Sequence, residues 1–299
     1  MVDLQSQYQK IKNEVDEKVL NVMQSAMFIN GPEVQNFQKE LENYLDVKHV
    51  IPCANGTDAL QIALMALHLE PGDEVITADF TFAATVEVVH LLKLKSVLVD
   101  VDYDTFNIDI DKLKAAITPK TKAIIPVHLF GQCANMEAVL EVAKEHNLYV
   151  IEDNCQGIGA DYKFADGTTK KSGTMGTIGV TSFFPSKNLG CYGDGGAIFT
   201  NDDDLAYKIR GIVNHGMYKR YYHDEVGVNS RLDSVQAAVL RVKLPLLDTY
   251  NAARRSAADY YDRAFANHPN ILTPKRAENS THVFHQYTLR ILNGKRNEL

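Results

Sequence analysis

Apolar side chains in the first 45 residues recur at helical spacing. In residues 3–25 they stand three or four positions apart, and residues 33–45 repeat the pattern with Val34, Phe37, Leu41 and Tyr44. This period places them on one face of a helix. Both segments therefore predict amphipathic helices.

From residue 49 onward, short apolar stretches alternate with helical patterns. Strands are predicted over 49–54, 74–78, 96–102, 122–129 and 148–153, and helices over 57–70, 83–92, 109–117 and 136–147. Several strands are continuously apolar and rich in Val and Ile, which is typical of a parallel sheet covered on both faces. Repeated strand–helix units predict a right-handed α/β layer structure, with ligands at the carboxyl ends of the strands.

After residue 160 the pattern changes. Strands are predicted over 178–184 and 195–200, a helix over 202–213, and a long helical stretch from near Arg231 past Tyr260. Residues 282–292 alternate in the manner of a strand. The fold class is therefore α/β. We expect a large domain, 1–230, with a mostly parallel central sheet flanked by helices, and the start of a smaller C-terminal α/β domain, 231–299.

Composition excludes several classes of function. Among 299 residues, 45% are hydrophobic and the net charge is −7, so the chain can bury a sizeable core but lacks the basic surface of a non-specific nucleic-acid binder. The cysteines Cys53, Cys133, Cys155 and Cys191 form no CxxC pair, which favours free thiols in a reducing compartment. No apolar signal segment opens the chain, and no run reaches the length of a membrane span. We expect a cytoplasmic protein without a membrane partner.

Polar residues follow the predicted strands at the edge where ligands bind. Gly56 and Thr57 stand where the first strand turns into a helix, and such a turn is suited to anions. An ordinary turn capped by Asn55 or Thr57 is the alternative interpretation, and this motif alone favours it. Asp153 ends a buried strand and needs a partner there: a cap, a salt bridge, or a cationic ligand such as a protonated pyridine nitrogen.

Lys187 lies between two segments that both read as buried strands. A surface lysine in a loop is the ordinary interpretation. A lysine in a crevice can instead form a Schiff base, because desolvation favours the neutral amine. No metal-ligand spacing and no GxSxG elbow competes with this reading. An anion cup, a strand-end Asp153 and a lysine 34 positions later together predict a pyridoxal-phosphate (PLP) enzyme.

The chain resembles the DegT/DnrJ/EryC1/StrS family of sugar aminotransferases, of fold-type I, over nearly its whole length. The matching segments, in chain order, are "FINGPEVQNFQKELENYLDVKHVIPCANGTDAL", "PGDEVITADFTFAAT", "PVHLFGQ", "VIEDNCQGIGA", "SFFPSKNLGCYGDGGAIFT", "NHG" and "GVNSRLDSVQAAVL". The family continues for several tens of residues beyond the last segment of this chain. The resemblance therefore implies an incomplete smaller domain and leaves in doubt any substrate residue that the missing part supplies.

The resemblance implies a role for each site residue in binding PLP. Lys187 would carry the cofactor as a Schiff base, Asp153 would pair with the pyridinium nitrogen, and Gln156 would lie near the ring hydroxyl. Phe82 would stack on the ring. The phosphate would be bound by Gly56, Thr57 and Ser182.

Two further residues are implied to act across a homodimer with shared active sites. Asn229 would reach the phosphate of the neighbouring subunit. Arg231 is a candidate for the anionic nucleotide sugar or the donor carboxylate, since a guanidinium binds such groups bidentately. Pairing of Arg231 with Asp233 or Asp224 at a helix start is the alternative.

Three other side chains near these motifs have open roles. His285 and His128 could each line a sugar pocket or be structural, and the structural interpretation is favoured for His128. Cys155 stands where the family has a small residue, so we expect a packing variant rather than a nucleophile.

The implied reaction is transamination of a nucleotide-linked keto-sugar with L-glutamate, for amino-sugar and surface-polysaccharide biosynthesis. Phe82 within "DFTFAAT" favours UDP- or dTDP-linked 3-keto sugars, because 4-amino enzymes often carry tryptophan there. A related sugar dehydratase would carry histidine in place of Lys187. A NAD-binding enzyme would need GxGxxG after the first strand, which "ANGTDAL" lacks. A non-catalytic PLP-binding relative remains an alternative.

Overall fold

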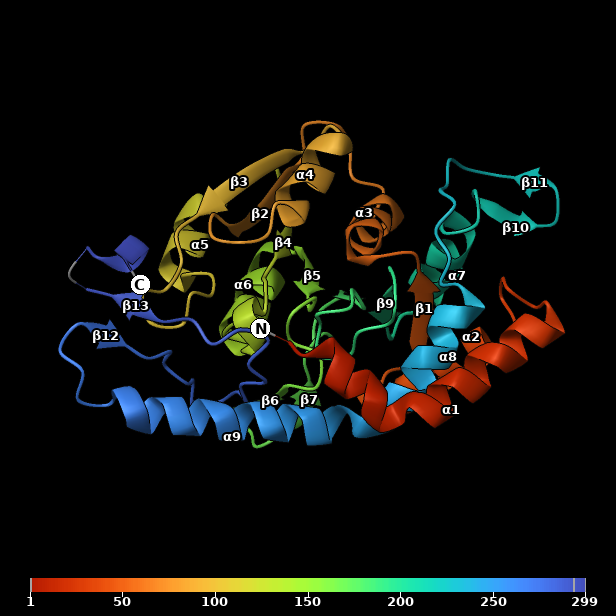
Figure 1. Ribbon diagram of the computed structural model, residues 1–299. Coiled ribbons are helices and arrows are strands. Elements are labelled where there is room, and N and C mark those ends of the chain that lie inside the picture. The colour runs from red at the N-terminus through yellow and green to blue at the C-terminus, as the bar shows by residue number, and fades with distance from the viewer. Residues whose placement is uncertain (1, 293, 299) are drawn as a thin grey trace.

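The computed structural model describes residues 2–292 and 294–298, and Figure 1 shows their arrangement. The helices are α1 (Leu4–Ser25), α2 (Pro32–Leu45), α3 (Gly56–Ala66), α4 (Ala84–Leu91), α5 (Ile110–Ala116), α6 (Met136–His146), α7 (Asp203–Ile212), α8 (Ser234–Lys243) and α9 (Leu247–Phe265). Short 3-10 helices are η1 (Leu129–Gly131), η2 (Leu244–Leu246) and η3 (Arg296–Glu298). The strands are β1 (His49–Cys53), β2 (Glu74–Ala78), β3 (Lys95–Val99), β4 (Thr121–Ile125), β5 (Tyr149–Asp153), β6 (Asp161–Lys163), β7 (Thr169–Lys171), β8 (Ile178–Ser182), β9 (Gly196–Thr200), β10 (Met217–Lys219), β11 (Tyr222–His223), β12 (Ile271–Leu272) and β13 (Arg290–Ile291).

The central sheet has the strand order β1-β9-β8-β5-β4-β2-β3. Neighbours from β8 to β3 pair in parallel, whereas β9 runs antiparallel to both β1 and β8. Every strand of this sheet except β9 therefore points the same way. The prediction of a mostly parallel sheet is confirmed, and the carboxyl ends of β1, β8, β5, β4 and β2 share one edge.

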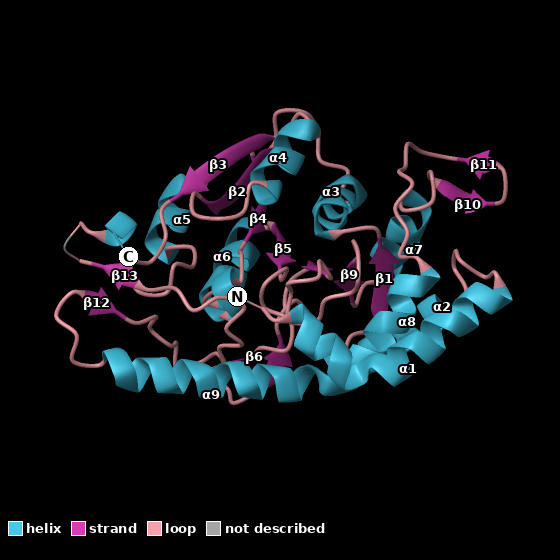
Figure 2. Ribbon diagram, in the orientation of Figure 1, coloured by secondary structure: helices cyan, strands magenta, loops and turns pink. Residues whose placement is uncertain are grey.

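Helices cover both faces of this sheet, as Figure 2 shows. Ile51, Ile125 and Ile151 pack with α3, α4 and α7 in one buried cluster. Their sequence neighbours lie on the opposite face, where Val50 packs with α2 and α8 and Ile124 packs with α5 and α6. Successive strand residues point to opposite faces, so continuously apolar strands need a helical layer on each side.

Short polar side chains begin several of the helices. An oxygen of each accepts a backbone N–H in the first turn of α3, α5, α6 and α7; these caps are Asn55, Asp109, Asn135 and Asp202. Such caps satisfy N–H groups that have no partner inside the helix. Asn55, one of the two residues expected to cap α3, is the residue that does so.

The long helix expected from near Arg231 is divided in the structure. It begins at Ser234 as α8, passes through η2, and continues as α9 to Phe265. Pro245 lies within η2. Proline has no N–H for the helical hydrogen-bond ladder, which accounts for the interruption.

The prediction of a strand over 282–292 was wrong for most of that range. Only Arg290–Ile291 forms a strand, β13, paired with β12. Phe284 has φ 45°, in the left-handed region, which breaks the extended backbone. The carbonyl of Phe284 instead accepts from Nη1 of Arg254 at 3.0 Å, and Val283 N–H donates to the carbonyl of Gly131 at 2.8 Å.

Two hairpins, β6–β7 and β10–β11, were not predicted. The first turns at Asp166 and Gly167, and Gly167 has φ +89°, so this Asp-Gly pair was a readable turn signal. The division into 1–230 and 231–299 stays a prediction; α8 packs against α1 and α2 from the other part. No helix within the described residues is both long and apolar enough to cross a membrane.

Candidate active site

A cavity of about 700 Å³ lies at the carboxyl edge of the sheet. Eight of the predicted site residues line it: Gly56, Thr57, Phe82, Asp153, Gln156, Ser182, Lys187 and His285. They come from the segments after β1, β2, β5 and β8 and from the irregular C-terminal segment. Asn229 and Arg231 do not line it.

The first turn of α3 forms one wall of the cavity. A Cβ on Gly56 would lie 2.8 Å from Cβ of Ser182 and 3.0 Å from Sγ of Cys155, so a side chain here would push α3 away from β8. The first N–H groups of a helix lack partners within it, and the helix dipole favours an anion beside them. This turn and the Ser182 hydroxyl are suited to a phosphate.

Asp153 lies at the end of β5 and is buried, with 4% of its surface exposed. Its Oδ2 accepts from the Thr85 hydroxyl at 2.9 Å, and its Oδ1 accepts from the N–H of Cys155 at 3.2 Å. Among the residues that the structure describes, no cation forms an ion pair with it. A cationic nitrogen in the cavity would supply the missing countercharge.

Gln156 has a fixed orientation beside the cavity. The N–H of Phe130 donates to Oε1 of Gln156 at 2.7 Å. Because a backbone N–H needs an acceptor, the amide oxygen faces Phe130 and the NH₂ group is left to donate elsewhere. An oxygen ligand such as a ring hydroxyl fits that donor.

Lys187 sits in a turn between β8 and β9 and is half-buried. The backbone N–H of Lys187 donates to the carbonyl of Phe184 at 2.8 Å. The next residue, Asn188, is buried and donates to Oδ1 of Asn251 at 2.7 Å and to the carbonyl of Val283 at 3.0 Å. The turn is thus tied to α9 and to the C-terminal segment, which holds Lys187 at the cavity.

His285 lies beside Lys187 with an unused ring nitrogen. Burial, with smaller effects from the charges of Lys187 and Arg254, lowers the pKa of His285 to about 3, so the ring is neutral at pH 7. Its Nδ1 is buried and has no hydrogen-bond partner among the described residues. A buried polar atom without a partner indicates that a ligand completes the site.

These features fit pyridoxal phosphate. The site provides an anion-binding helix start, a buried carboxylate for a pyridinium, an amide donor and a lysine amine. Phe82 lines the same cavity with 70% of its surface exposed, so its ring is free to stack on a ligand.

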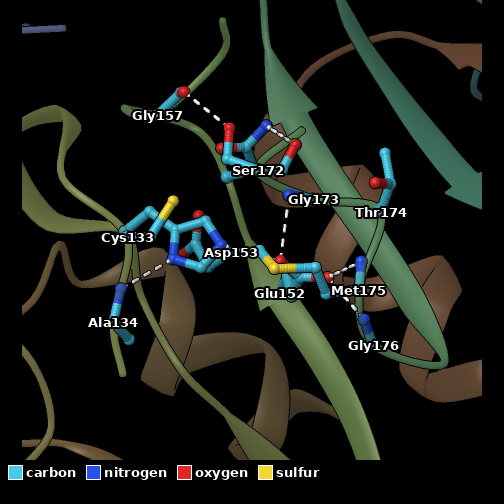
Figure 3. Close-up of polar contacts among 12 residues, drawn as sticks. Cys133, Ala134, Glu152, Asp153, Gly157, Ser172, Gly173, Thr174, Met175 and Gly176 are labelled. Carbon is cyan, nitrogen blue, oxygen red and sulfur yellow. Dashed lines mark hydrogen bonds and ion pairs between the residues drawn. The ribbon is translucent and has the colours of Figure 1, made fainter. Parts of the chain in front are cut away.

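His128, by contrast, has a structural role. It is fully buried and does not line the cavity. The N–H of Ala134 donates to its Nδ1 at 3.2 Å, so Nε2 carries the hydrogen shared with Glu152 at 2.8 Å. Figure 3 shows that Glu152 also accepts backbone N–H groups of the loop before β8 (Gly173, Met175 and Gly176).

Asn229 and Arg231 lie on a segment beside α7. Asn229 forms an antiparallel bridge with Asn214, and Nη2 of Arg231 donates to Oδ1 of Asn214 at 2.8 Å. Within the described residues, Arg231 pairs with neither Asp224 nor Asp233. The roles expected for both residues in a partner's site stay predictions.

Cys155 packs against the first turn of α3. Burial and the nearby Asp153 carboxylate raise the pKa of the Cys155 thiol well above its usual range. A protonated thiol is a poor nucleophile, which supports its interpretation as a packing residue.

Sequence reasoning missed several residues of the site. Thr85, which donates to Asp153, was not singled out, although hydroxyls four positions apart at 81 and 85 were a readable signal. Asp58, Asp194 and Gln286 also line the cavity. No local pattern marks these last three.

Comparison with known proteins gives the family. A profile of the DegT/DnrJ/EryC1/StrS aminotransferase family matches residues 9–299. The chain is 49% identical to the UDP-2-acetamido-2-deoxy-3-oxo-D-glucuronate aminotransferase of Pseudomonas aeruginosa, over 98% of this chain and 80% of the relative. It is also 49% identical to a pleiotropic regulatory protein of Geobacillus stearothermophilus, over 100% of this chain and 79% of the relative.

A solved structure gives the same result. The crystal structure of S. venezuelae DesV in complex with a ketimine intermediate superposes with a TM-score of 0.94 at 38% identity, covering 99% of this chain and 78% of that one. The chain therefore belongs to the DegT/DnrJ/EryC1/StrS aminotransferase family, whose enzymes depend on PLP.

Proposed function

We propose that this chain transfers the amino group of L-glutamate to a nucleotide-linked 3-keto-sugar, UDP- or dTDP-linked, in amino-sugar and surface-polysaccharide biosynthesis. The observation that carries the proposal is the meeting of Lys187, Asp153 and the start of α3 in one cavity. The relative of Pseudomonas aeruginosa, named for a UDP-3-oxo-sugar, supports the substrate class. Four free cysteines support a cytoplasmic location.

Each residue has a defined task in this proposal. Bound PLP supplies a ring that accepts electrons from the carbon being deprotonated. Lys187 holds the cofactor through Nζ and, once released, takes the proton from Cα of glutamate. The Asp153 carboxylate favours the protonated ring nitrogen, and the NH₂ group of Gln156 donates to the ring oxygen. Phe82 covers the ring and excludes water.

His285 is proposed to bind the substrate. Its ring is neutral and its buried Nδ1 is unpartnered among the described residues, so it can exchange a hydrogen bond with a sugar hydroxyl.

We infer a homodimer with shared sites from the exposed surface. Leu20, Met23 and Ile29, near the end of α1, are each more than half exposed. The β10–β11 hairpin stands away from the body of the chain (Figure 1). Val226, which follows this hairpin, is 83% exposed. Exposed apolar side chains on these two segments favour burial against a second copy.

The dimer can be tested by complementation. A Lys187→Ala subunit and an Asn229→Ala, Arg231→Ala subunit, each nearly inactive alone, are mixed and allowed to exchange. A mixed dimer then has one site with both defects and one intact site, so activity returns to roughly a quarter of wild type. Proven heterodimers without recovery would show that Asn229 and Arg231 serve their own subunit.

The catalytic proposal is tested by absorption spectroscopy and turnover. The holoenzyme should show a visible cofactor band that borohydride abolishes, with the reduced adduct on Lys187. Glutamate should remove the band and yield one 2-oxoglutarate per site, and a UDP- or dTDP-linked 3-keto-sugar should restore it. A band unaffected by glutamate would favour the alternative of a non-catalytic PLP-binding relative. Loss of water from the sugar without transfer of nitrogen would favour a dehydratase.

A further inference from the structure

Two threonine hydroxyls form a chain that leads from the cavity to Asp153. Thr81 follows β2 and lines the cavity, whereas Thr85 lies in the first turn of α4 and is fully buried. Their Oγ1 atoms are 3.0 Å apart, and Oγ1 of Thr85 is 2.9 Å from Oδ2 of Asp153. Neither threonine has a role in the reaction proposed for this site.

The direction of this chain follows from its hydrogens. An ionised carboxylate can only accept, so Thr85 donates its single hydroxyl hydrogen to Asp153. Thr85 then has no hydrogen left for Thr81, and Thr81 must donate to Thr85. The polarity therefore runs from Thr81 through Thr85 to the carboxylate, and it depends on Asp153 being ionised.

The contacts of Asp153 make the Thr85 hydroxyl important. Burial disfavours a charged carboxylate. One N–H, from Cys155, reaches Oδ1 at 3.2 Å, and Thr85 supplies the shorter bond, at 2.9 Å, to Oδ2. Ser and Thr donors to a charged acceptor form the stronger class of hydrogen bond. Thr85 is therefore the hydroxyl donor that holds Oδ2.

We propose that Thr85 is a positioning residue for the aminotransferase reaction: it holds the Asp153 carboxylate in the orientation that would face the ring nitrogen of bound PLP, with Thr81 orienting Thr85. This inference rests on the proposed role of Asp153. Its consequence is that the protonation of the bound ring nitrogen depends on a hydroxyl that does not touch the cofactor.

The test compares variants of the holoenzyme. Thr85→Val removes the hydroxyl and keeps the branched shape, and Thr85→Ser restores it. Thr77→Val is the matched control, because Thr77 is equally buried but donates to the carbonyl of Ile125 at 2.8 Å instead. Asp153→Asn replaces the carboxylate by a neutral amide and so gives the size of the effect when the Asp153 charge is lost completely.

Two readouts separate positioning from folding. The first is the pH midpoint of the visible cofactor band, and the second is single-turnover reaction with glutamate. Thr85→Val should move the midpoint in the same direction as Asp153→Asn and slow the glutamate step about tenfold or more, with little change in glutamate affinity. Thr85→Ser should return the pH midpoint close to the wild-type value and the rate of the glutamate step to within about threefold of wild type, and Thr77→Val should resemble wild type in both.

Each result decides the matter. If Asp153→Asn changes neither readout, the proposed role of Asp153 fails and this inference falls with it. If Asp153→Asn changes both and Thr85→Val changes neither, Asp153 keeps its role and the inference about Thr85 is overturned. Should Thr85→Val fail to fold, Thr81→Val takes its place; a smaller shift in the same direction supports the chain, and an unchanged midpoint refutes it.

Discussion

The neutral imidazole of His282 should make the stability of this protein depend on pH. His282 is buried and stacks on Phe284, with ring centroids 3.8 Å apart and planes at 5°. The Arg276 guanidinium lies 4.9 Å from the Phe284 ring. Burial first, and then the Arg276 charge, lowers the pKa of His282 from 6.5 to about 3.

The sign of the effect follows from proton binding. Between pH 6.5 and 3 the unfolded chain binds a proton on this ring and the folded chain does not, so acid favours unfolding. The stability is fully present above pH 6.5 and is lost as the pH falls toward 3. Between pH 7 and pH 5 the loss from His282 is about 2 kcal/mol, and any folded-state pKa below about 4 gives nearly the same figure.

His282→Asn tests this magnitude. Nδ1 of His282 accepts the N–H of Phe284 at 3.1 Å, and an asparagine oxygen can take that place without titrating. Urea unfolding of both holoproteins at pH 7 and pH 5, followed by circular dichroism, gives the free energies. The variant should be less stable at pH 7, because stacking is lost, but should lose about 2 kcal/mol less than wild type on acidification.

The exposed His68 provides the control, and His68→Asn should give a pH dependence parallel to wild type. If the free energy of unfolding falls equally for wild type and His282→Asn between pH 7 and pH 5, His282 is not held neutral by its surroundings and the reasoning is refuted.

Three further predictions follow from packing. Gly56→Ala should weaken PLP binding about tenfold, measured by spectroscopic titration, because its Cβ would lie 2.8 Å from Cβ of Ser182; unchanged affinity would show that α3 need not approach β8. Arg241→Met should lower the free energy of unfolding in urea by about 1 kcal/mol, because the Arg241 guanidinium donates to both carboxylate oxygens of Glu40 and so joins α8 to α2. Adding Glu40→Gln to this variant should lower the free energy of unfolding little further. Phe37→Ala should cost about 3–5 kcal/mol in the same assay, because the side chain is fully buried, and a cost below about 1 kcal/mol would contradict this packing.

The sequence alone determined the layered α/β fold and most of the cavity. The spacing of apolar residues distinguished strands from helices, and short polar residues such as Asn55 marked the positions where helices begin. The alternation of strands and helices placed Gly56 and Asp153 at one edge of the sheet, and the layout of PLP enzymes, with the family resemblance, implied that Lys187 joins them there. These signals are local patterns of spacing and residue type, which is why the sequence carries them.

Tertiary structure decided what depends on contacts between distant segments. The alternating segment 282–292 had the period of a strand, yet Arg254 and Gly131 take its backbone groups and only Arg290–Ile291 pairs. The bond from Thr85 to Asp153 joins residues 68 positions apart. Period and propensity report on the few residues around a position, whereas a hydrogen-bond partner or a lowered pKa is set by whichever chain packs alongside.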